Sequence, residues 1–149
     1  MSSSANEILT NLWLGDIRDS RNKEFINNVD IIINCSTNIP FLDDTKICKR
    51  ISVEDNLEKK EIANLYKYLD NSVKFIHSEL KKSKIIFIHC YAGKQRSASV
   101  ICAYIMWSNN LTYEQAKEFL ETKRKHIFTP LTNFKAALIL YQQNYITAE

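Results

Sequence analysis

One short segment of the sequence combines a nucleophile, a cation and a flexible turn. Cys90 follows an apolar run, Gly93 lies three residues later, and Arg96 and Ser97 come next. A thiol becomes a strong nucleophile when positive charge nearby favours the thiolate. A guanidinium can clamp two oxygens of one phosphate group. These residue types and their spacing therefore indicate covalent attack of a thiolate on a bound phosphate ester.

The flanking elements place this segment at the start of a helix. Residues 85–88 form the most apolar stretch and predict a central strand, and a helix is predicted from Ser97 to about residue 110. The first N–H groups of a helix are unpaired and carry partial positive charge, so the intervening loop suits an anion. The predicted phosphate-binding loop consists of Tyr91, Ala92, Gly93, Lys94, Gln95 and Arg96.

Two residues beside the loop have predicted supporting roles. Ser97 is expected to donate a hydrogen bond to the sulfur of Cys90, which eases its departure when a phosphocysteine breaks down. His89 is expected to order the loop through hydrogen bonds rather than to transfer protons. A cysteine after an apolar strand is often a plain buried thiol. The whole pattern of strand, histidine, cysteine, glycine, arginine, serine and helix is far more specific.

The run His89-Cys90-x-x-Gly93-x-x-Arg96-Ser97 resembles the signature of the cysteine-based protein tyrosine phosphatases. Its Arg-Ser ending and the chain length resemble the small, atypical dual-specificity branch. Arsenate reductases and the low-molecular-weight phosphatases share the cysteine-to-arginine spacing, but they carry it at the start of the chain. The likeness covers nearly the whole sequence, including residues 12–15, 32–34 and 103–106.

The resemblance implies a phosphomonoester hydrolase that works without a metal or cofactor. It would remove phosphate from phosphotyrosine and phosphoserine or phosphothreonine in proteins through a phosphocysteine intermediate. In this family an Asp on a loop after a strand acts as general acid, and Asp55, 35 residues before Cys90, is the matching position. Glu54 is a weaker candidate. The pair Asp43 and Asp44 lies in an earlier loop and is expected to be solvated.

Two further residues are singled out by the resemblance. Asn34 matches an asparagine that supports the phosphate loop from a neighbouring strand, although local bonds at the strand end are an alternative. Cys35 is a possible redox partner of Cys90, because some relatives protect the nucleophile as a disulfide.

The sequence predicts the type of reaction more clearly than the type of substrate. The order Ala-Gly-Lys, ending at Lys94, resembles phosphoinositide phosphatases, but Tyr91 stands where those enzymes have a second lysine. Phosphoinositides or RNA 5′-phosphates are therefore alternative substrates. A catalytically inert phosphate-binding module is another alternative, although such proteins typically lack the cysteine, the arginine or the acid.

The second half of the chain carries two more features of the resemblance. In the basic run 123–126, Arg124 or Lys125 is a candidate contact for a second phosphate or for the protein substrate, or the run complements a helix dipole. The family's Pro-Asn before the last helix is Pro130-Leu131 here, which leaves the geometry of that loop open.

The chain of 149 residues has the size of one domain and no internal repeat or linker, so residues 1–149 are expected to form a single catalytic domain. Residues 1–6 are expected to be a loose tail. The periodicities predict an α/β fold with a small, mostly parallel sheet of four to five strands flanked by helices. Further strands are predicted at 12–16, 31–35 and 47–53. Further helices are predicted at 58–81, at 113–124 behind a capping box of Thr112 and Gln115, and from Pro130 to Tyr145.

Composition and charge limit the partners and the cellular location that we expect for this protein. A net charge of +3 does not favour a nucleic-acid partner. No apolar run has the length of a membrane span, and the sequence starts without a basic or apolar signal region. The four cysteines have no zinc-site spacing and are expected to be free thiols. We therefore expect a soluble cytoplasmic protein, with the nucleus left open, that is a monomer and binds phosphorylated proteins.

Overall fold

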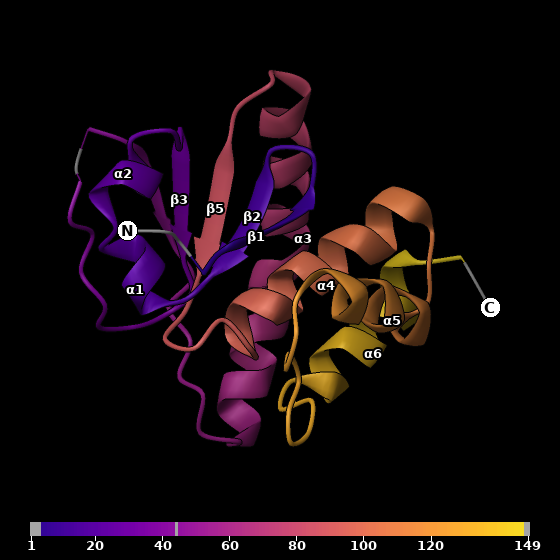
Figure 1. Cartoon of the computed structure of the whole chain (residues 1–149). Coiled ribbons are helices and arrows are strands. Elements are labelled where there is room, and N and C mark those ends of the chain that lie inside the picture. The colour runs from indigo at the N-terminus through magenta and orange to yellow at the C-terminus, as the bar shows by residue number, and fades with distance from the viewer. Residues whose placement is uncertain (1–3, 44, 148–149) are drawn as a thin grey trace.

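The computed structural model describes residues 4–43 and 45–147, with a five-stranded sheet at the centre (Figure 1). The strand order is β1-β2-β5-β3-β4, and β1 is antiparallel to β2 whereas the other neighbouring pairs are parallel. The predicted α/β class with a mostly parallel sheet is confirmed. The strands are β1 (Asn6–Leu9), β2 (Leu12–Gly15), β3 (Ile31–Asn34), β4 (Ile47–Arg50) and β5 (Ile86–His89).

Helices cover both faces of the sheet and make three layers (Figure 1). On the face that carries α1 (Ile17–Ser20) and α2 (Lys23–Ile26), a small cluster of buried side chains includes Ile26 of α2 and Phe87 of β5 (Figure 1). The larger core lies on the opposite face. It is covered by α3 (Lys59–Lys81), α4 (Arg96–Asn109), α5 (Tyr113–Lys123) and α6 (Lys135–Tyr145).

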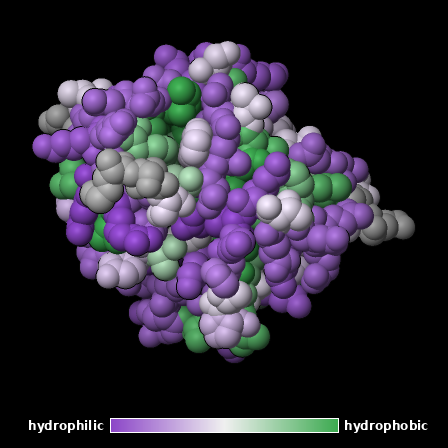
Figure 2. Space-filling view, in the orientation of Figure 1, coloured by the Kyte–Doolittle hydropathy of each residue, from purple (hydrophilic) through white to green (hydrophobic). Residues whose placement is uncertain are grey.

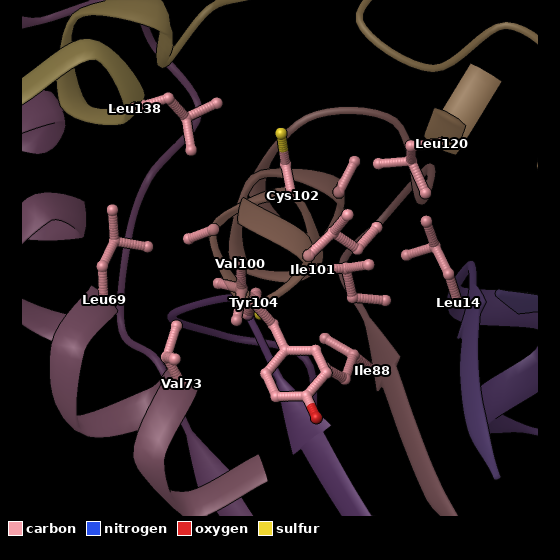
Figure 3. Close-up of a cluster of buried hydrophobic side chains, with 14 of the residues drawn as sticks. Leu14, Leu69, Val73, Ile88, Val100, Ile101, Cys102, Tyr104, Leu120 and Leu138 are labelled. Atoms are coloured by element: carbon pink, nitrogen blue, oxygen red, sulfur yellow. The ribbon is translucent and has the colours of Figure 1, made fainter. Parts of the chain in front are cut away.

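Helix α4 is the centre of the larger core. Every residue from Arg96 to Met106 is buried, and Figure 3 shows its side chains meeting Leu69 and Val73 of α3 on one side and Leu14 of β2 on the other. A helix that is apolar on all sides is stable only inside a protein. This burial fixes the start of α4, and therefore fixes the loop that precedes it.

Parallel register brings three strand ends together. Gly15 of β2 and Asn34 of β3 both pair with His89, the last residue of β5. The loops that follow these strands therefore converge at one edge of the sheet, where parallel-sheet proteins commonly bind ligands. The face shown in Figure 2 is mostly hydrophilic, with hydrophobic residues in small groups. Within the described residues, no helix combines the length and the apolar character needed to cross a membrane.

Several predicted boundaries need correction. Asn6 is not part of a loose tail, because it begins β1 and pairs with Leu14; residues 1–3 lie outside the described residues. The strand predicted at 47–53 ends at Arg50, although Ile51 and Val53 stay buried. The two four-residue helices α1 and α2 were not predicted, since they are too short to show a period.

The last helix begins five residues later than predicted. Pro130 follows a cis peptide bond and α6 starts at Lys135, so the proline does not open the helix. Residues 129–133 instead form hydrogen bonds with Gln95. The capping box of Thr112 and Gln115 is confirmed at the start of α5.

Candidate active site

Hydrogen bonds from other segments of the chain to the backbone carbonyls of residues 91–96 hold the phosphate loop in place. Loop carbonyls accept hydrogen bonds from distant parts of the chain: Tyr91 from the Ile17 N–H at 2.9 Å, Ala92 from Arg124 Nη2 at 3.5 Å, Gly93 from Arg124 Nε at 3.0 Å, and Lys94 from the Phe128 N–H at 2.9 Å.

These bonds orient the amides of the loop. A trans peptide unit directs its C=O and its N–H to opposite sides. Because the carbonyls of Tyr91, Gly93 and Lys94 turn toward the scaffold, the N–H groups of the residues that follow them turn away from it. No group in the described part of the chain accepts from these N–H groups. The loop therefore presents donors of the kind that bind a phosphate oxyanion.

Cys90 lies at the base of a cavity of about 420 Å³. Its side chain is 2% exposed, and its Sγ lies 3.0 Å from Ser97 Oγ. The two side chains are therefore within hydrogen-bonding distance, and donation from Ser97 to the sulfur stays a prediction. The cavity is lined by Asp55, Cys90, Tyr91, Ala92, Lys94, Gln95, Arg96, Thr129 and Asn133.

Arg96 reaches across the cavity from the first turn of α4. Its Nη1 donates to the Val53 carbonyl at 3.0 Å, which orients the guanidinium. Its Nε is buried and has no hydrogen-bond partner within the described residues. A buried donor without a partner is costly. A bound oxyanion would satisfy this N–H, so the side chain is suited to the phosphate-clamping role predicted for it.

Asp55 is the acidic side chain that lines this cavity. Its Oδ1 accepts a hydrogen bond from Asn133 Nδ2 at 2.9 Å. The carboxylate of Glu54 is instead bonded by the Thr37 hydroxyl. Asp43 lines a different cavity, and Asp44 lies outside the described residues. Of the predicted acidic candidates that are described, Asp55 is therefore the one that the fold brings to Cys90.

His89 is 1% exposed, and its ring stacks on Phe87. Its Nδ1 lies 3.2 Å from the carbonyl oxygen of Cys90. Burial lowers the pKa of His89 to about 4, because the charged imidazolium is poorly solvated there. A neutral imidazole that contacts the loop backbone fits the predicted ordering role.

Asn34 makes its side-chain bonds within its own loop. Its Nδ2 donates to the Ile39 carbonyl at 2.7 Å, and its Oδ1 accepts from Ser36 Oγ at 2.5 Å. These bonds favour the local alternative, and support of the phosphate loop by this amide stays a prediction. The polar ends of the side chain are used by the turn after β3, which is the local alternative that the sequence left open.

Cys35 comes directly after β3 and lies close to Cys90. Its N–H donates to the His89 carbonyl at 2.7 Å, one residue before Cys90. Complete burial, together with the nearby charge of Cys90, raises the pKa of Cys35 well above its ordinary value. All four cysteines are free thiols, as expected. A disulfide between Cys35 and Cys90 under oxidation stays a prediction.

Arg124 supports the back of the phosphate loop. Besides its bond to Gly93, it donates to the Ser4 carbonyl at 3.0 Å and to Asn6 Oδ1 at 2.8 Å. Burial lowers its pKa. The hypothesis that Arg124 contacts a second phosphate does not fit this geometry, because protein oxygens already occupy its donors. The sequence gives no signal that would separate these two roles.

A larger basic cavity lies next to the one that contains Cys90. It has a volume of about 720 Å³ and shares Tyr91, Ala92 and Lys94 with the smaller cavity. Its other charged walls include Arg18, Lys123 and Lys125. Lys125 lines this cavity, and its contact with a substrate stays a prediction.

A family model and curated relatives match most of this chain. The sequence model of the family described as dual specificity phosphatase, catalytic domain, matches residues 12–144. Mouse dual specificity protein phosphatase 8 is 32% identical over 96% of this chain, and human dual specificity protein phosphatase 16 is 33% identical over 91% of it. The chain spans about a fifth of the length of these relatives, 21% and 20% respectively.

Solved structures share the fold. A mouse putative dual specificity phosphatase complexed with zinc tungstate has a TM-score of 0.83 at 20% identity, over 96% of this chain and 89% of that one. Human DUSP28 has a TM-score of 0.82, also at 20% identity, over 96% and 95% of the two chains.

Proposed function

Because the chain belongs to the dual specificity phosphatase family of cysteine-based protein phosphatases, we propose that it hydrolyses phosphomonoesters of tyrosine, serine and threonine in proteins. The observation that carries the proposal is that Cys90, Arg96 and Asp55 line one cavity. The same cavity is bordered by loop N–H groups that no described group uses. An inert phosphate-binding module would not need a nucleophile and an acid in the lining of its anion site.

In the first step, the thiolate of Cys90 attacks phosphorus, and the bond from phosphorus to the ester oxygen breaks. Asp55 gives its proton to that leaving oxygen, so the alcohol or phenol departs uncharged. The loop N–H groups and Arg96 bind the phosphoryl oxygens while charge redistributes in the transition state. The products are a phosphocysteine and the dephosphorylated hydroxyl group.

In the second step, the carboxylate of Asp55 removes a proton from water, which attacks the phosphocysteine. The phosphorus–sulfur bond breaks and the thiolate of Cys90 reforms. Ser97 donates to the departing sulfur across the 3.0 Å contact and stabilises its negative charge. Phosphate leaves, and Asp55 is protonated again for the next turnover. No step requires a metal ion.

Basic side chains around the entrance support an acidic macromolecular substrate. Lys94 borders both cavities, and Lys123 and Lys125 extend the positive charge away from Cys90. A phosphoprotein segment with further acidic groups would bind across this surface. Turnover of phosphopeptides, soluble inositol phosphates and 5′-triphosphate RNA, measured side by side, tests this assignment. Preference for either non-protein substrate would replace the proposed substrate class while retaining the chemistry.

The test of the chemistry is hydrolysis of an aryl phosphate by the wild type and by Cys90→Ser. The variant should lose essentially all turnover and still bind inorganic phosphate. Cys48→Ser is the matched control, because Cys48 is a cysteine outside the cavity, and it should retain the wild-type rate. Vanadate should inhibit and a chelator should not. Substantial turnover by Cys90→Ser would contradict the covalent mechanism.

A further inference from the structure

A continuous series of hydrogen bonds joins Asp55 to the phosphate loop. The side-chain Nδ2 of Asn133 donates to Asp55 Oδ1 at 2.9 Å, and the backbone N–H of Asn133 donates to Gln95 Oε1, also at 2.9 Å. We propose that Asn133 is a positioning residue for the general acid, and that Gln95 fixes Asn133 in place. This inference rests on the proposed function, since it assigns a role toward the acid of that reaction.

Gln95 is able to fix the loop because its amide is fully engaged. It is 6% exposed, and its Nε2 donates to the carbonyl of Leu131 at 2.7 Å and to that of Thr129 at 3.3 Å. Its Oε1 takes the N–H of Asn133. Both ends of one amide therefore hold residues 129–133. Gln95 directly precedes Arg96, so the anion-binding residues and the loop that carries Asn133 are held together.

The contact specifies how Asp55 can carry its proton. Asn133 Nδ2 is a donor, so Oδ1 of Asp55 acts as an acceptor in this bond. The proton to be transferred then belongs on Oδ2. After the transfer, the carboxylate still has one donor on Oδ1 and keeps its orientation for the water step. A fixed acid reaches the leaving oxygen more often than a freely rotating one.

Other bonds from described residues to the side chain of Asp55 are absent, so Asn133 is its one fixed support. Residues 51–58 form no helix or strand, and the Asp55 side chain is exposed at this bond. The backbone of residues 51–58 therefore restrains the Asp55 side chain only weakly. Because the bond lies in water-accessible surroundings, we expect its loss to cost about tenfold in rate and not to unfold the protein.

The test compares Asn133→Ala with the wild type on a series of aryl phosphates of increasing leaving-group basicity, measured as kcat/KM. For a basic phenol the loss should be about tenfold, and for a dinitrophenol it should be less than about twofold, since that leaving group needs little protonation. Leu131→Ala is the matched control from the same loop, because its side chain is 74% exposed and its bonded carbonyl is retained. It should behave as wild type.

Two further variants separate positioning from folding. In the Asp55→Asn background, Asn133→Ala should have no additional effect, because the acid that it positions is already lost. Asn133→Asp keeps the side-chain size and the backbone bond to Gln95 but removes the donor, and it should be at least as slow as Asn133→Ala. An equal loss on every leaving group, full additivity with Asp55→Asn, or a wild-type rate for Asn133→Asp would overturn the proposal. Failure of the proposed function would instead show as an inactive wild type or an active Cys90→Ser.

Discussion

Gly93 packs directly against the backbone of Gly15. A Cβ atom on Gly93 would lie 2.5 Å from the Gly15 carbonyl oxygen and 2.8 Å from its carbonyl carbon, and Gly93 has a φ of +67°. The two glycines of the chain thus meet at the edge where β2 and β5 end. Close approach of these two backbones allows the phosphate loop to sit on the end of β2.

Gly93→Ala should therefore disrupt the phosphate loop. The added methyl group would collide with backbone that cannot rotate away, and the left-handed conformation alone costs an alanine about 1 kcal/mol. We expect kcat/KM for an aryl phosphate to fall more than about a hundredfold, since catalysis depends on the placement of the loop donors. Ala63→Gly, at an exposed position of α3 away from the loop, is the control and should retain the wild-type rate. Near-normal rates for Gly93→Ala would contradict this packing account.

The sequence was sufficient to predict which residues of this site lie together around Cys90. One strand–loop–helix unit contains Cys90, Arg96 and Ser97. Their separation along the chain therefore determines how far apart they lie in the structure. Asp55 came from the resemblance, and the fold brings it to the same cavity. The relative positions of residues within one rigid unit are easier to predict from the sequence than contacts between separate loops.

Ser97→Ala should slow the second step more than the first. Its hydroxyl lies 3.0 Å from the sulfur, where it stabilises the thiolate that departs from phosphorus. Loss of one such donor typically costs about 10²–10³ in rate at an oxyanion, and a weaker effect of about tenfold to a hundredfold is expected at sulfur. Pre-steady-state kinetics should then show a burst of aryl alcohol followed by slow turnover. A proportional loss in the burst rate itself would contradict this role.

Arg124→Met should loosen the phosphate loop. Four backbone carbonyls, those of Gly93, Ser4, Leu14 and Ala92, would lose a charged donor. We expect the free energy of unfolding to fall by about 2 kcal/mol, measured by urea denaturation, and inhibition by inorganic phosphate to weaken several-fold. Lys125→Ala should change neither quantity, because Lys125 lines only the basic cavity. An unchanged inhibition constant for Arg124→Met would show that the arginine does not support the loop.

His89 should make stability depend on acid pH. Its pKa is lowered to about 4 in the folded protein, against about 6.5 in the unfolded chain. The unfolded state therefore takes up a proton first, so the contribution is fully present above pH about 6.5 and is lost as the pH falls toward about 4. The difference corresponds to about 3 kcal/mol. Urea unfolding at a series of pH values checks this, and His89→Gln should flatten the dependence between these limits. An equal slope for both proteins would assign the effect to other groups.

The contacts that the sequence did not predict join segments far apart in the chain. Asn133 lies 78 residues from Asp55 and 38 from Gln95. Pro130 was expected to open a helix, whereas residues 129–133 fold back onto Gln95 instead. The basic run indicated a contact between Arg124 and a substrate. The fold shows instead that Arg124 donates hydrogen bonds to backbone oxygens of the protein. Such roles depend on tertiary packing, which short-range patterns do not contain.

The most direct measurement is trapping of the phosphoenzyme. Wild-type protein mixed rapidly with an excess of an aryl phosphate and quenched in acid should gain the mass of one phosphoryl group. Fragmentation should place that group on the peptide with Cys90, and Ser97→Ala should increase the trapped fraction. Hydrolysis without any mass increase, or a phosphoryl group on a residue other than Cys90, would contradict the account.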